Sequence, residues 1–356
     1  MRIILANPRG FCAGVHMAVD VVDQLIDLSD GKPVYVFHEI VHNKHVVGRF
    51  RERGAIFVED LSDVPEGSLT VFSAHGVSPA VRELARRRNL VTVDATCPLV
   101  TKVHSEAIRY ARQGYQILLV GHANHQEVVG TRGEAPDAIQ VVESPDDIPS
   151  LSIKDPGKLV YLTQTTLSTD DAEVIIRALK AAFPQIKEPP SSDICYATTN
   201  RQMAVRQIAP ECDLVLVVGS KNSSNSLRLT EISQNVGVKA FLLDDVSELR
   251  DEWFADTPGG GRDAVVLLTA GASAPEDLVA EICRTLIARY GGEPGALEQR
   301  DVMPEDVEFG IPVTLKKIMR EHGIDPENKK IRVGVHDITR EAYGAVALTV
   351  AGRAPA

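Results

Sequence analysis

The sequence is notable first for what it has little of. It has no apolar run near the ~20 residues that a membrane span needs, and the longest runs, such as 214–219 and 264–268, have the length of a strand. Aromatic residues make up only 5%, and 38 basic against 49 acidic residues leave a net charge of -11. A general nucleic-acid-binding surface and a membrane-bound state are therefore not expected. Any anionic ligand must be held by local groups.

Cysteine is also scarce. The 356 residues include five cysteines, an odd number spread over a long chain. This argues against a disulfide framework and indicates thiols that are buried, catalytic or metal-bound. The N-terminus begins with a strand-like run into 7–10, without the basic and then apolar pattern of a secretory signal. We therefore expect a cytoplasmic protein.

Runs of Val, Ile and Leu alternate with helical patterns along almost the whole chain. This alternation is typical of α/β units around parallel sheets. The predicted strands are 1–6, 34–37, 69–73, 91–94, 116–120, 159–163, 214–218, 240–243 and 265–269. The fold class predicted from this pattern is α/β, and the length favours two or three domains.

Three cysteine segments repeat one arrangement. The segments are NPRGFCAGV at 7–15, DATCPLVTKVH at 94–104 and SDICYATTNRQ at 192–202, and each places a cysteine just before a helical pattern. The positive end of a helix dipole favours a thiolate, which is a better metal ligand than a thiol. The two nearly equal intervals between Cys12, Cys97 and Cys195 indicate three similar lobes. Cys212 and Cys283 fall in strand and helix patterns and are expected to be buried and inert.

Several interpretations of these thiols are open. Each cysteine alone could be an ordinary buried residue, but the triple repetition argues against it. Structural zinc usually uses short C-x-x-C pairs and four ligands, and this sequence has no such pair. Three distant cysteines fit a 4Fe-4S cluster between lobes. Such a cluster normally takes four cysteines, so one iron would be left without a protein thiolate and could act as a Lewis acid.

Polar residues gather where predicted strands end, which is where ligands bind in α/β proteins. The segments are HEIVHN at 38–43, FSAHGVSP at 72–79, GHANHQEVVGT at 121–131, VGSKNSSNS at 218–226 and LTAGASAPE at 268–276. Taken singly, a Ser- and Asn-rich loop is at least as often a helix cap as a phosphate site. Together the segments offer histidines, hydroxyls and backbone amides to phosphate oxygens. They predict a pocket for a phosphorylated ligand.

On these motifs the sequence resembles the 4-hydroxy-3-methylbut-2-enyl diphosphate reductases, which act last in the methylerythritol phosphate route to isoprenoids. The resemblance covers residues 1 to about 310, and the long motifs occur in the family order. It implies a trefoil of three α/β lobes around a central 4Fe-4S cluster, one per chain. The lobes are predicted at 13–96, 97–194 and 195–310, the last together with strand 1–12. The tail 311–356 has no counterpart in the family.

The resemblance also implies roles for individual residues. Cys12, Cys97 and Cys195 would hold the cluster, and Glu127 would deliver protons. Thr165 would lie beside the substrate hydroxyl. Substrate binding is assigned to His42, His75, His125, Thr165, Ser223, Ser224, Asn225 and Ser273. His38, His122 and Thr198 are given supporting roles. Gln126 stands where the family usually has proline.

The implied reaction is reductive dehydroxylation of an allylic diphosphate. Protonation through Glu127 would make the hydroxyl a better leaving group, and two electrons and a further proton would give isopentenyl or dimethylallyl diphosphate. The family expectation for the electron donor is a ferredoxin or a flavodoxin. Two alternatives remain at this point. One is a phosphohydrolase with a divalent metal on His122, His125 and Glu127 together with His42 and His75, and the other is an iron-sulfur redox sensor.

Overall fold

The strands form where the sequence is richest in Val, Ile and Leu. The structure is a computed structural model that describes residues 1–291, 296–326, 331–333 and 348–351. Every predicted strand is present, as β1 (Arg2–Asn7), β2 (Val34–Phe37), β4 (Leu69–Phe72), β5 (Val91–Asp94), β6 (Gln116–Val120), β8 (Leu159–Thr163), β9 (Leu214–Val218), β10 (Ala240–Leu243) and β11 (Val265–Ala270). Strands such as β8 and β9 are buried along their whole length. Burial of both faces explains their continuous apolar runs.

The strands build three parallel sheets. The first has the order β3-β2-β4-β5, where β3 is Ala55–Val58, and the second has the order β7-β6-β8, where β7 is Ile139–Val142. The third has the order β10-β9-β11-β1-β12-β15, where β12 is Leu297–Asp301 and β15 is Leu348–Ala351. The first strand of the chain therefore lies inside the third sheet, between β11 and β12. A separate antiparallel pair joins β13 (Val307–Phe309) to β14 (Ile331–Val333).

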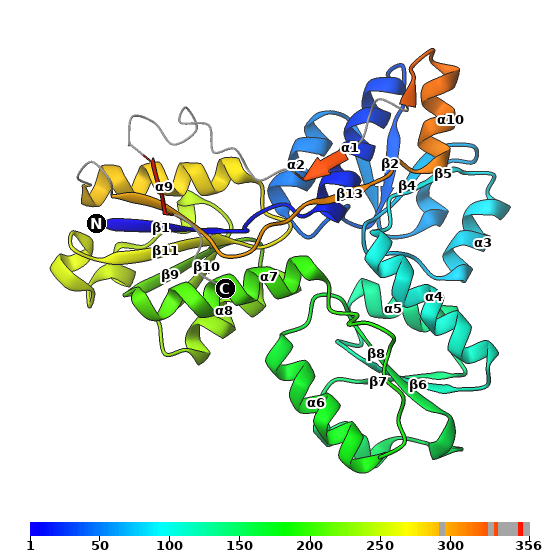
Figure 1. Cartoon of the computed structure of the whole chain (residues 1–356). Coiled ribbons are helices and arrows are strands. Elements are labelled where there is room, and N and C mark those ends of the chain that lie inside the picture. Colours follow the sequence, from blue (N-terminus) through cyan, green and yellow to red (C-terminus); the bar gives the residue numbers. More distant parts are fainter. Residues whose placement is uncertain (292–295, 327–330, 334–347, 352–356) are drawn as a thin grey trace.

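Each sheet carries its own helices, and the three units form the trefoil in Figure 1. The helices are α1 (Ala13–Leu28), α2 (Lys44–Glu52), α3 (Pro79–Arg87), α4 (Pro98–Arg112), α5 (Gln126–Glu134), α6 (Thr169–Ala182), α7 (Tyr196–Ile208), α8 (Ser224–Asn235), α9 (Glu276–Tyr290) and α10 (Val313–Glu321). In the third unit, α9 covers one face of the sheet, and α7 and α8 cover the other (Figure 1). The prediction of an α/β protein with three lobes in a trefoil is confirmed.

The predicted tail 311–356 begins with a segment that packs on the first sheet unit, whereas its strand β15 belongs to the third sheet. Ile311, together with Leu315 and Met319 of α10, is buried in the hydrophobic core that α1 forms with β2 and β4. Burial of three apolar side chains explains why this helix docks there. Residues 327–330, 334–347 and 352–356 of the tail lie outside the described residues.

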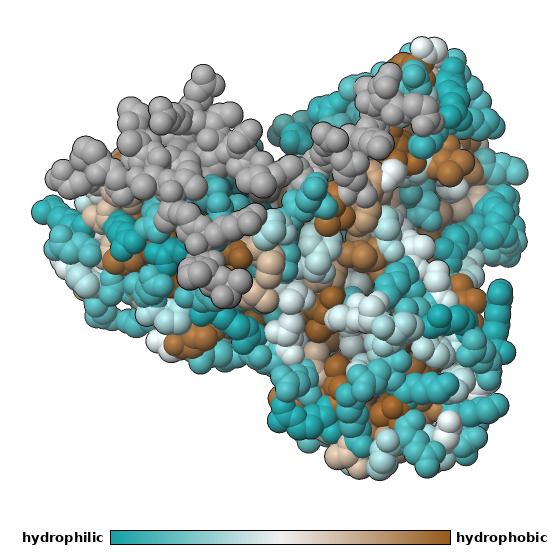
Figure 2. All heavy atoms as spheres, in the orientation of Figure 1, coloured by the Kyte–Doolittle hydropathy of each residue, from teal (hydrophilic) through white to brown (hydrophobic). Residues whose placement is uncertain are grey.

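The visible surface is mostly hydrophilic, with apolar side chains in smaller patches (Figure 2). In the described part of the chain, no helix combines the length and the hydropathy needed to cross a membrane. The apolar residues of the strands and helices are instead buried in hydrophobic cores between the sheets and their helices.

Candidate functional site

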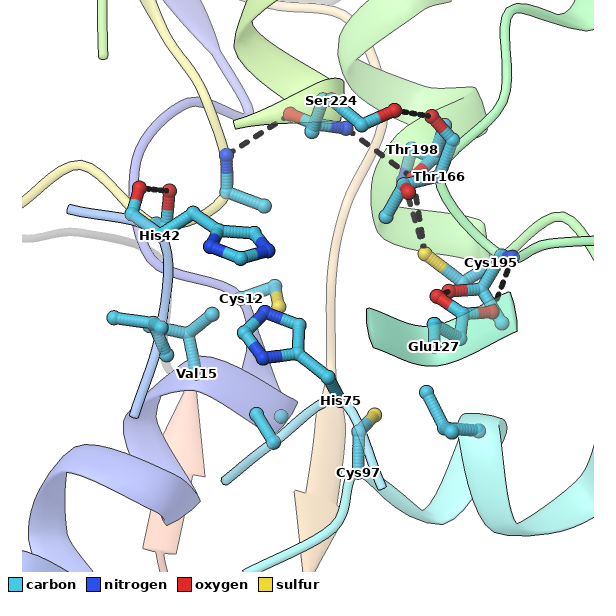
Figure 3. Close-up of a pocket in the computed structure, with 18 of the residues that line it drawn as sticks. Cys12, Val15, His42, His75, Cys97, Glu127, Thr166, Cys195, Thr198 and Ser224 are labelled. Carbon is cyan, nitrogen blue, oxygen red and sulfur yellow. Dashed lines mark hydrogen bonds between the residues drawn. The ribbon is translucent and has the colours of Figure 1, made fainter. Parts of the chain in front are cut away.

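Three helices begin at the predicted cysteines. Cys12 is the N-cap of α1, Cys97 the N-cap of α4 and Cys195 the N-cap of α7. All three side chains line one cavity, and Figure 3 shows their sulfur atoms facing it from different helices. The arrangement brings together residues that are far apart in the sequence, as the repeated segments predicted.

The same cavity is lined by every other residue to which the sequence assigned catalysis or substrate binding. These are His42, His75, His125, Glu127, Thr165, Ser223, Ser224, Asn225 and Ser273. The cavity lining includes the N-cap residues of α1, α4, α5, α7 and α8, so helix starts from all three sheet units contribute to it.

Burial controls the charge of the three thiols. It raises the pKa of Cys195 to about 11, and it also raises the pKa of Cys12 and of Cys97, where the neighbouring thiol of Cys12 acts in the same direction. The helix N-termini act in the opposite direction, since backbone N–H groups lower the pKa of each thiol. The helix N-termini thus act in the expected direction, but they do not bring the pKa of any of the three thiols below its usual value. Desolvation is the larger effect.

A glycine lets two of the cysteine helices approach each other. A Cβ added at Gly14, in the first turn of α1, would lie 2.6 Å from Cys97 Sγ and 4.0 Å from Cys12 Sγ. No side chain fits in that space, so only glycine permits this approach. Gly14 stands two positions after Cys12, inside the segment NPRGFCAGV that the sequence analysis singled out.

Cys195 is held by a chain of polar contacts. Its Sγ accepts a hydrogen bond from Thr198 N at 3.4 Å and lies 3.1 Å from Thr198 Oγ1. Asn225 Nδ2 donates to Thr198 Oγ1 at 3.2 Å, and Asn225 Oδ1 accepts from Ala272 N at 2.9 Å. The thiol is thus connected to the loops that carry the predicted serines, and Thr198 has the supporting position that the sequence suggested.

Three histidine rings pack against one another at the other end of the cavity. The rings of His42 and His75 are stacked with centroids 4.0 Å apart, and the ring of His125 stands edge-on to both, at 5.4 Å and 6.0 Å. Burial lowers the pKa of His125 to about 4 and lowers the pKa of His75 well below its usual value. The positive charge that His42 can carry lowers both further. His75 and His125 are therefore neutral near pH 7 in the ligand-free protein.

The hydrogen bonds of His125 determine which of its nitrogens can donate. Its Nδ1 accepts from the backbone N–H of Glu127 at 3.2 Å, as the N-cap of α5. In the neutral ring the proton is therefore on Nε2. A nitrogen that carries a proton is a donor for an anionic oxygen.

The serine loops meet beside these histidines. Ser273 Oγ lies 2.9 Å from the carbonyl oxygen of His42, to which it can donate, and 3.3 Å from Ser223 Oγ. Ser223 is the N-cap of α8, and Ser224 Oγ donates to the carbonyl oxygen of Thr166 at 2.9 Å. The site thus combines a helix N-terminus with hydroxyl groups, an arrangement that suits phosphate oxygens.

Glu127 and Thr165 form a buried pair beside Cys195, whose backbone N–H donates to the carbonyl oxygen of Thr165 at 3.0 Å. Glu127 Oε1 accepts from Thr165 N at 2.6 Å, and Glu127 Oε2 accepts from Thr165 Oγ1 at 2.8 Å. The Glu127 residue is only 2% exposed. Burial raises the pKa of Glu127 to about 7, although both hydrogen bonds from Thr165 lower it. A carboxyl group with this pKa can both hold and release a proton near neutral pH.

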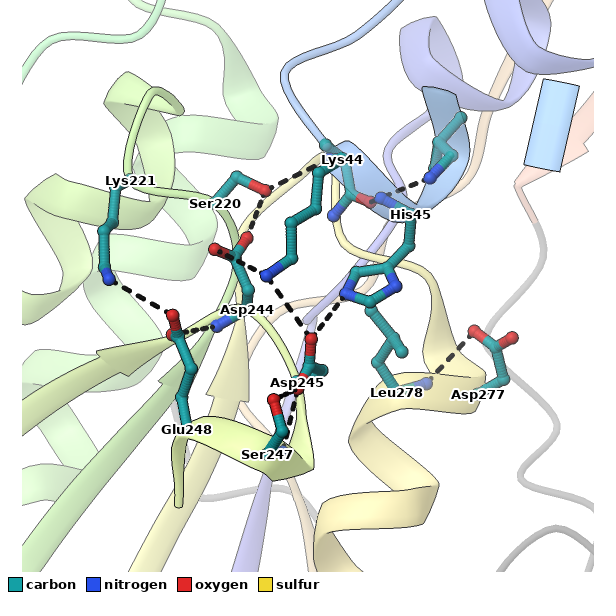
Figure 4. A network of polar contacts seen from close by, with 12 residues as sticks. Lys44, His45, Ser220, Lys221, Asp244, Asp245, Ser247, Glu248, Asp277 and Leu278 are labelled. Carbon is teal, nitrogen blue, oxygen red and sulfur yellow. Dashed lines mark hydrogen bonds and ion pairs between the residues drawn. The ribbon is translucent and has the colours of Figure 1, made fainter. Parts of the chain in front are cut away.

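The loop that carries His42 is joined to the third sheet unit by charges. Figure 4 shows Lys44 Nζ between Asp244 and Asp245, at 3.3 Å and 3.4 Å, with His45 Nε2 3.0 Å from Asp245. The backbone N–H of Lys44 also donates to Ser220 Oγ at 3.3 Å. These contacts join the start of α2 to the loop after β10 and the loop after β9.

Two histidines with predicted supporting roles make other contacts. His38 Nδ1 lies 2.6 Å from Glu59 Oε2, and His122 Nε2 lies 3.0 Å from Arg228 Nη2. Sequence reasoning missed Thr166 as a lining residue, although it directly follows Thr165 in the chain. Within the described residues, no three or more His, Cys, Asp or Glu side chains are grouped so as to hold a single metal ion. The histidine and glutamate set of the hydrolase alternative is thus not arranged as such a site.

The fold and the cavity define a class of protein: a three-lobed α/β protein with three converging cysteines and a neighbouring anion pocket. A profile of the LytB protein family matches residues 3–287. The chain belongs to this family.

Curated relatives carry a common name. A protein of Acidothermus cellulolyticus is 51% identical over 323 residues, which is 90% of this chain and 92% of the relative. One of Salmonella typhi is 50% identical over 324 residues, which is 90% of this chain and 99% of the relative. Both are named 4-hydroxy-3-methylbut-2-enyl diphosphate reductase.

Solved structures agree with this assignment. The structure of the E-1-hydroxy-2-methyl-but-2-enyl-4-diphosphate reductase from Plasmodium falciparum is 40% identical, with a TM-score of 0.85, and the match covers 90% of this chain and 99% of that one. A structure of (E)-4-hydroxy-3-methyl-but-2-enyl diphosphate reductase, the terminal enzyme of the non-mevalonate pathway, is 32% identical with a TM-score of 0.57. This second match covers 81% of this chain and 99% of that one. The resemblance stated from the motifs is confirmed, and the chain is an oxidoreductase of this family.

Proposed function

We propose that the chain reduces 4-hydroxy-3-methylbut-2-enyl diphosphate to isopentenyl and dimethylallyl diphosphate in the cavity lined by the three cysteines. The single observation that carries the proposal is that cavity, which brings three N-cap cysteines, three packed histidines and a buried carboxyl group together. The reaction consumes two electrons and two protons, and it releases the hydroxyl group as water.

The cysteines fit a 4Fe-4S cluster. Cys12, Cys97 and Cys195 are free thiols from separate helices that face one space, and Gly14 leaves room between two of them. Thiolates are the usual ligands of iron-sulfur clusters, and helix N-termini offset their negative charge. When bound there, the cluster would supply electrons and one iron that no cysteine occupies. The high pKa values of the free thiols mean that cluster binding must release their protons.

The histidine end of the cavity fits the diphosphate. His125 can donate through Nε2, and His42, His75, Ser223, Ser224, Asn225 and Ser273 surround the same space. An anion that enters between neutral histidines raises their pKa, so proton uptake adds positive charge when the ligand arrives. Local histidines and hydroxyl groups would therefore attract the anion, although the chain as a whole has a net charge of -11.

Glu127 is placed to hold the proton that leaves with the hydroxyl group. Its pKa of about 7 keeps a large fraction protonated at neutral pH, and Thr165 orients both of its oxygens. Thr165 itself lines the cavity and can contact the substrate hydroxyl. Proton donation to a poor leaving group is the contribution expected of such a pair.

The proposal also covers the electron donor and the location of the protein. The electrons would come from a ferredoxin or a flavodoxin, and the protein would work in the cytoplasm. Both statements rest on the family to which the chain belongs.

The deciding experiment is an anaerobic assay on protein whose iron and sulfide have been counted. We expect about four iron and four inorganic sulfide per chain, together with turnover of the hydroxylated allylic diphosphate by a chemical reductant. Release of phosphate without reductant, with zinc or manganese and no sulfide, would replace the proposal by the hydrolase. A full cluster with no product would replace it by the redox sensor.

A further inference from the structure

Two arginines are completely buried next to the loop that carries Cys12. Arg9 lies in that loop and Arg201 lies on α7, and each side chain is 0% exposed. A buried guanidinium is costly unless it is paired and hydrogen-bonded. The contacts of the two arginines therefore indicate what each is used for.

Arg201 binds the Cys12 loop with a fork of hydrogen bonds. Its Nε and Nη2 both donate to the carbonyl oxygen of Gly10, at 3.1 Å and 2.8 Å, and Nη1 donates to the carbonyl oxygen of Ala197 at 2.9 Å. Gly10 has a φ of +62°, and a Cβ there would lie 3.1 Å from the carbonyl oxygen of Ala274, so the backbone of this loop favours glycine at the position that Arg201 binds. One guanidinium thus ties the loop of Cys12 to the first turn of the Cys195 helix.

The charge of Arg201 is balanced by a carboxylate from far along the chain. Nη1 of Arg201 lies 3.0 Å from Glu305 Oε1, and the Glu305 side chain is only 6% exposed. Asn200 Nδ2 also donates to Glu305 Oε1, at 3.2 Å. Glu305 lies between β12 and β13, beyond the residues 3–287 that the family profile matches. Both charges are shielded from water, so their fields are weakly screened.

The two charges act on Cys12 with opposite sign. Burial is the main cause of the raised pKa of the Cys12 thiol; Arg201 lowers that pKa and Glu305 raises it, in keeping with a guanidinium bound to Gly10, two residues before Cys12, and a carboxylate bound to that guanidinium. The other buried pair differs in this respect. Arg9 donates to Glu276 Oε1 at 3.1 Å and 2.5 Å. Besides burial, this pair acts on the pKa of Cys283, a thiol of α9 that lies in a hydrophobic core and does not line the cavity.

We propose that the buried pair Arg201 and Glu305 sets the reduction potential of the iron-sulfur cluster at Cys12, and that Arg201 also positions the Cys12 loop. The inference rests on the proposed cofactor. Reduction adds negative charge to the cluster, so a nearby buried cation raises its reduction potential and a nearby buried carboxylate lowers it. Arg201 and Glu305 are positioning residues here, because they act through Cys12 and its loop.

The test is the midpoint potential of the cluster in the full-length, cluster-loaded protein, measured by a redox titration followed by electron paramagnetic resonance. Glu305→Gln keeps the size of the side chain and an acceptor for Arg201 but removes the negative charge. We expect its midpoint potential to be more positive than that of the unsubstituted protein. Glu305→Asp keeps the charge, and its midpoint potential should remain closer to the original value.

Glu276→Gln is the matched control. It removes a carboxylate from the other buried arginine pair beside the same loop, and we expect its potential to stay unchanged. A full cluster whose potential is unaltered or more negative in Glu305→Gln would overturn the inference. So would equal shifts in Glu305→Gln and Glu276→Gln, or in Glu305→Gln and Glu305→Asp, because the effect would then not follow the charge at position 305.

Iron and sulfide analysis separates this inference from the function on which it rests. Absence of iron and sulfide from the unsubstituted protein would reject the proposed cofactor, and the inference with it. A Glu305→Gln protein that folds normally but holds no cluster, beside a loaded unsubstituted protein, would reject the inference alone, because Glu305 would then be needed for assembly of the site.

Discussion

One end of the cavity is lined by acidic groups and the other by histidines, and at both ends burial disfavours the charged form of these groups. At the cysteine end it raises the pKa of Cys195 to about 11 and of Glu127 to about 7, and at the histidine end it lowers the pKa of His125 to about 4. In the empty cavity near pH 7, Cys195 is therefore a neutral thiol and His125 a neutral ring, while Glu127 is about half protonated. The comparison teaches that proton transfer accompanies binding at both ends, in opposite directions. The thiols lose protons when a cluster binds, and the histidines gain protons when an anion binds.

The largest expected effect separates cysteines at helix N-caps from cysteines in cores. Cys97→Ser should lose the cluster, because a serine hydroxyl is a poor substitute for a thiolate ligand. Cys283→Ser should keep it, because Cys283 is fully buried in the core under α9. The measurement is iron and sulfide per chain after anaerobic purification. Equal iron content in the two variants would contradict the division of the cysteines into two groups.

The next effect tests the carboxyl group at the cysteine end. Glu127→Gln keeps the shape of the side chain but cannot hold and release the proton, so kcat should fall by about 10²- to 10⁴-fold. Cluster content and KM should change little, since the amide oxygen of the substituted side chain would still be able to accept a hydrogen bond from Thr165. Steady-state kinetics on cluster-loaded protein give both values. A kcat near that of the unsubstituted enzyme would remove Glu127 from proton delivery.

The pH dependence of that step follows from the raised pKa. Glu127 donates a proton only when protonated, and burial raises its pKa to about 7. We therefore expect turnover at saturating substrate to decline as the pH rises above about 7, and the decline to be absent from the residual activity of Glu127→Gln. A decline that persists unchanged in the variant would assign it to another group.

The histidine end should respond to pH in the same sense, but through binding instead of turnover. His75 and His125 are neutral near pH 7 when the cavity is empty and gain protons when an anion binds, so ligand affinity should strengthen as the pH falls from about 8 to about 6. Inorganic diphosphate is a suitable probe, with calorimetry as the measurement. His125→Asn should bind it more weakly and with a flatter pH profile.

The comparison of His125→Asn with the unsubstituted protein separates the titration of His125 from that of the diphosphate probe. Diphosphate titrates in the same pH range, but its own protonation is common to both proteins, so the difference between the two profiles belongs to His125. Parallel profiles would mean that His125 does not gain a proton on binding.

The fold was predictable from sequence where strands are buried on both faces. The long apolar runs that became β8, β9 and β11 are of this type. The strands β3 and β7 were missed, and both are short edge strands that are only partly buried. β12 was missed because its sequence, LEQRD, is polar. Its pairing with β1 is a tertiary effect that no local pattern shows.

The site was predictable where motifs are long and local. The N-cap cysteines and strand-end histidines lie inside contiguous segments, so residue type and spacing were enough to bring them together. The raised thiol pKa was not predictable, because burial depends on the packing of all three lobes. The contact of Arg201 with Glu305 was missed for a similar reason, since it joins residues about a hundred positions apart that share no pattern.

The smallest expected effect concerns the charges that hold the His42 loop. Lys44 bridges to Asp244 and Asp245 across two lobes, but its side chain is 50% exposed, so the pairs are screened and worth ~1 kcal/mol or less. Lys44→Met should therefore raise KM by only a few-fold, through a less well-placed His42, and leave kcat within about twofold. Lys221→Met is the control, because Lys221 pairs with Glu248 inside one lobe. If both substitutions raised KM equally, the effect would come from the loss of surface charge near an anion site, and the bridge between the lobes would have no part in placing the histidine end.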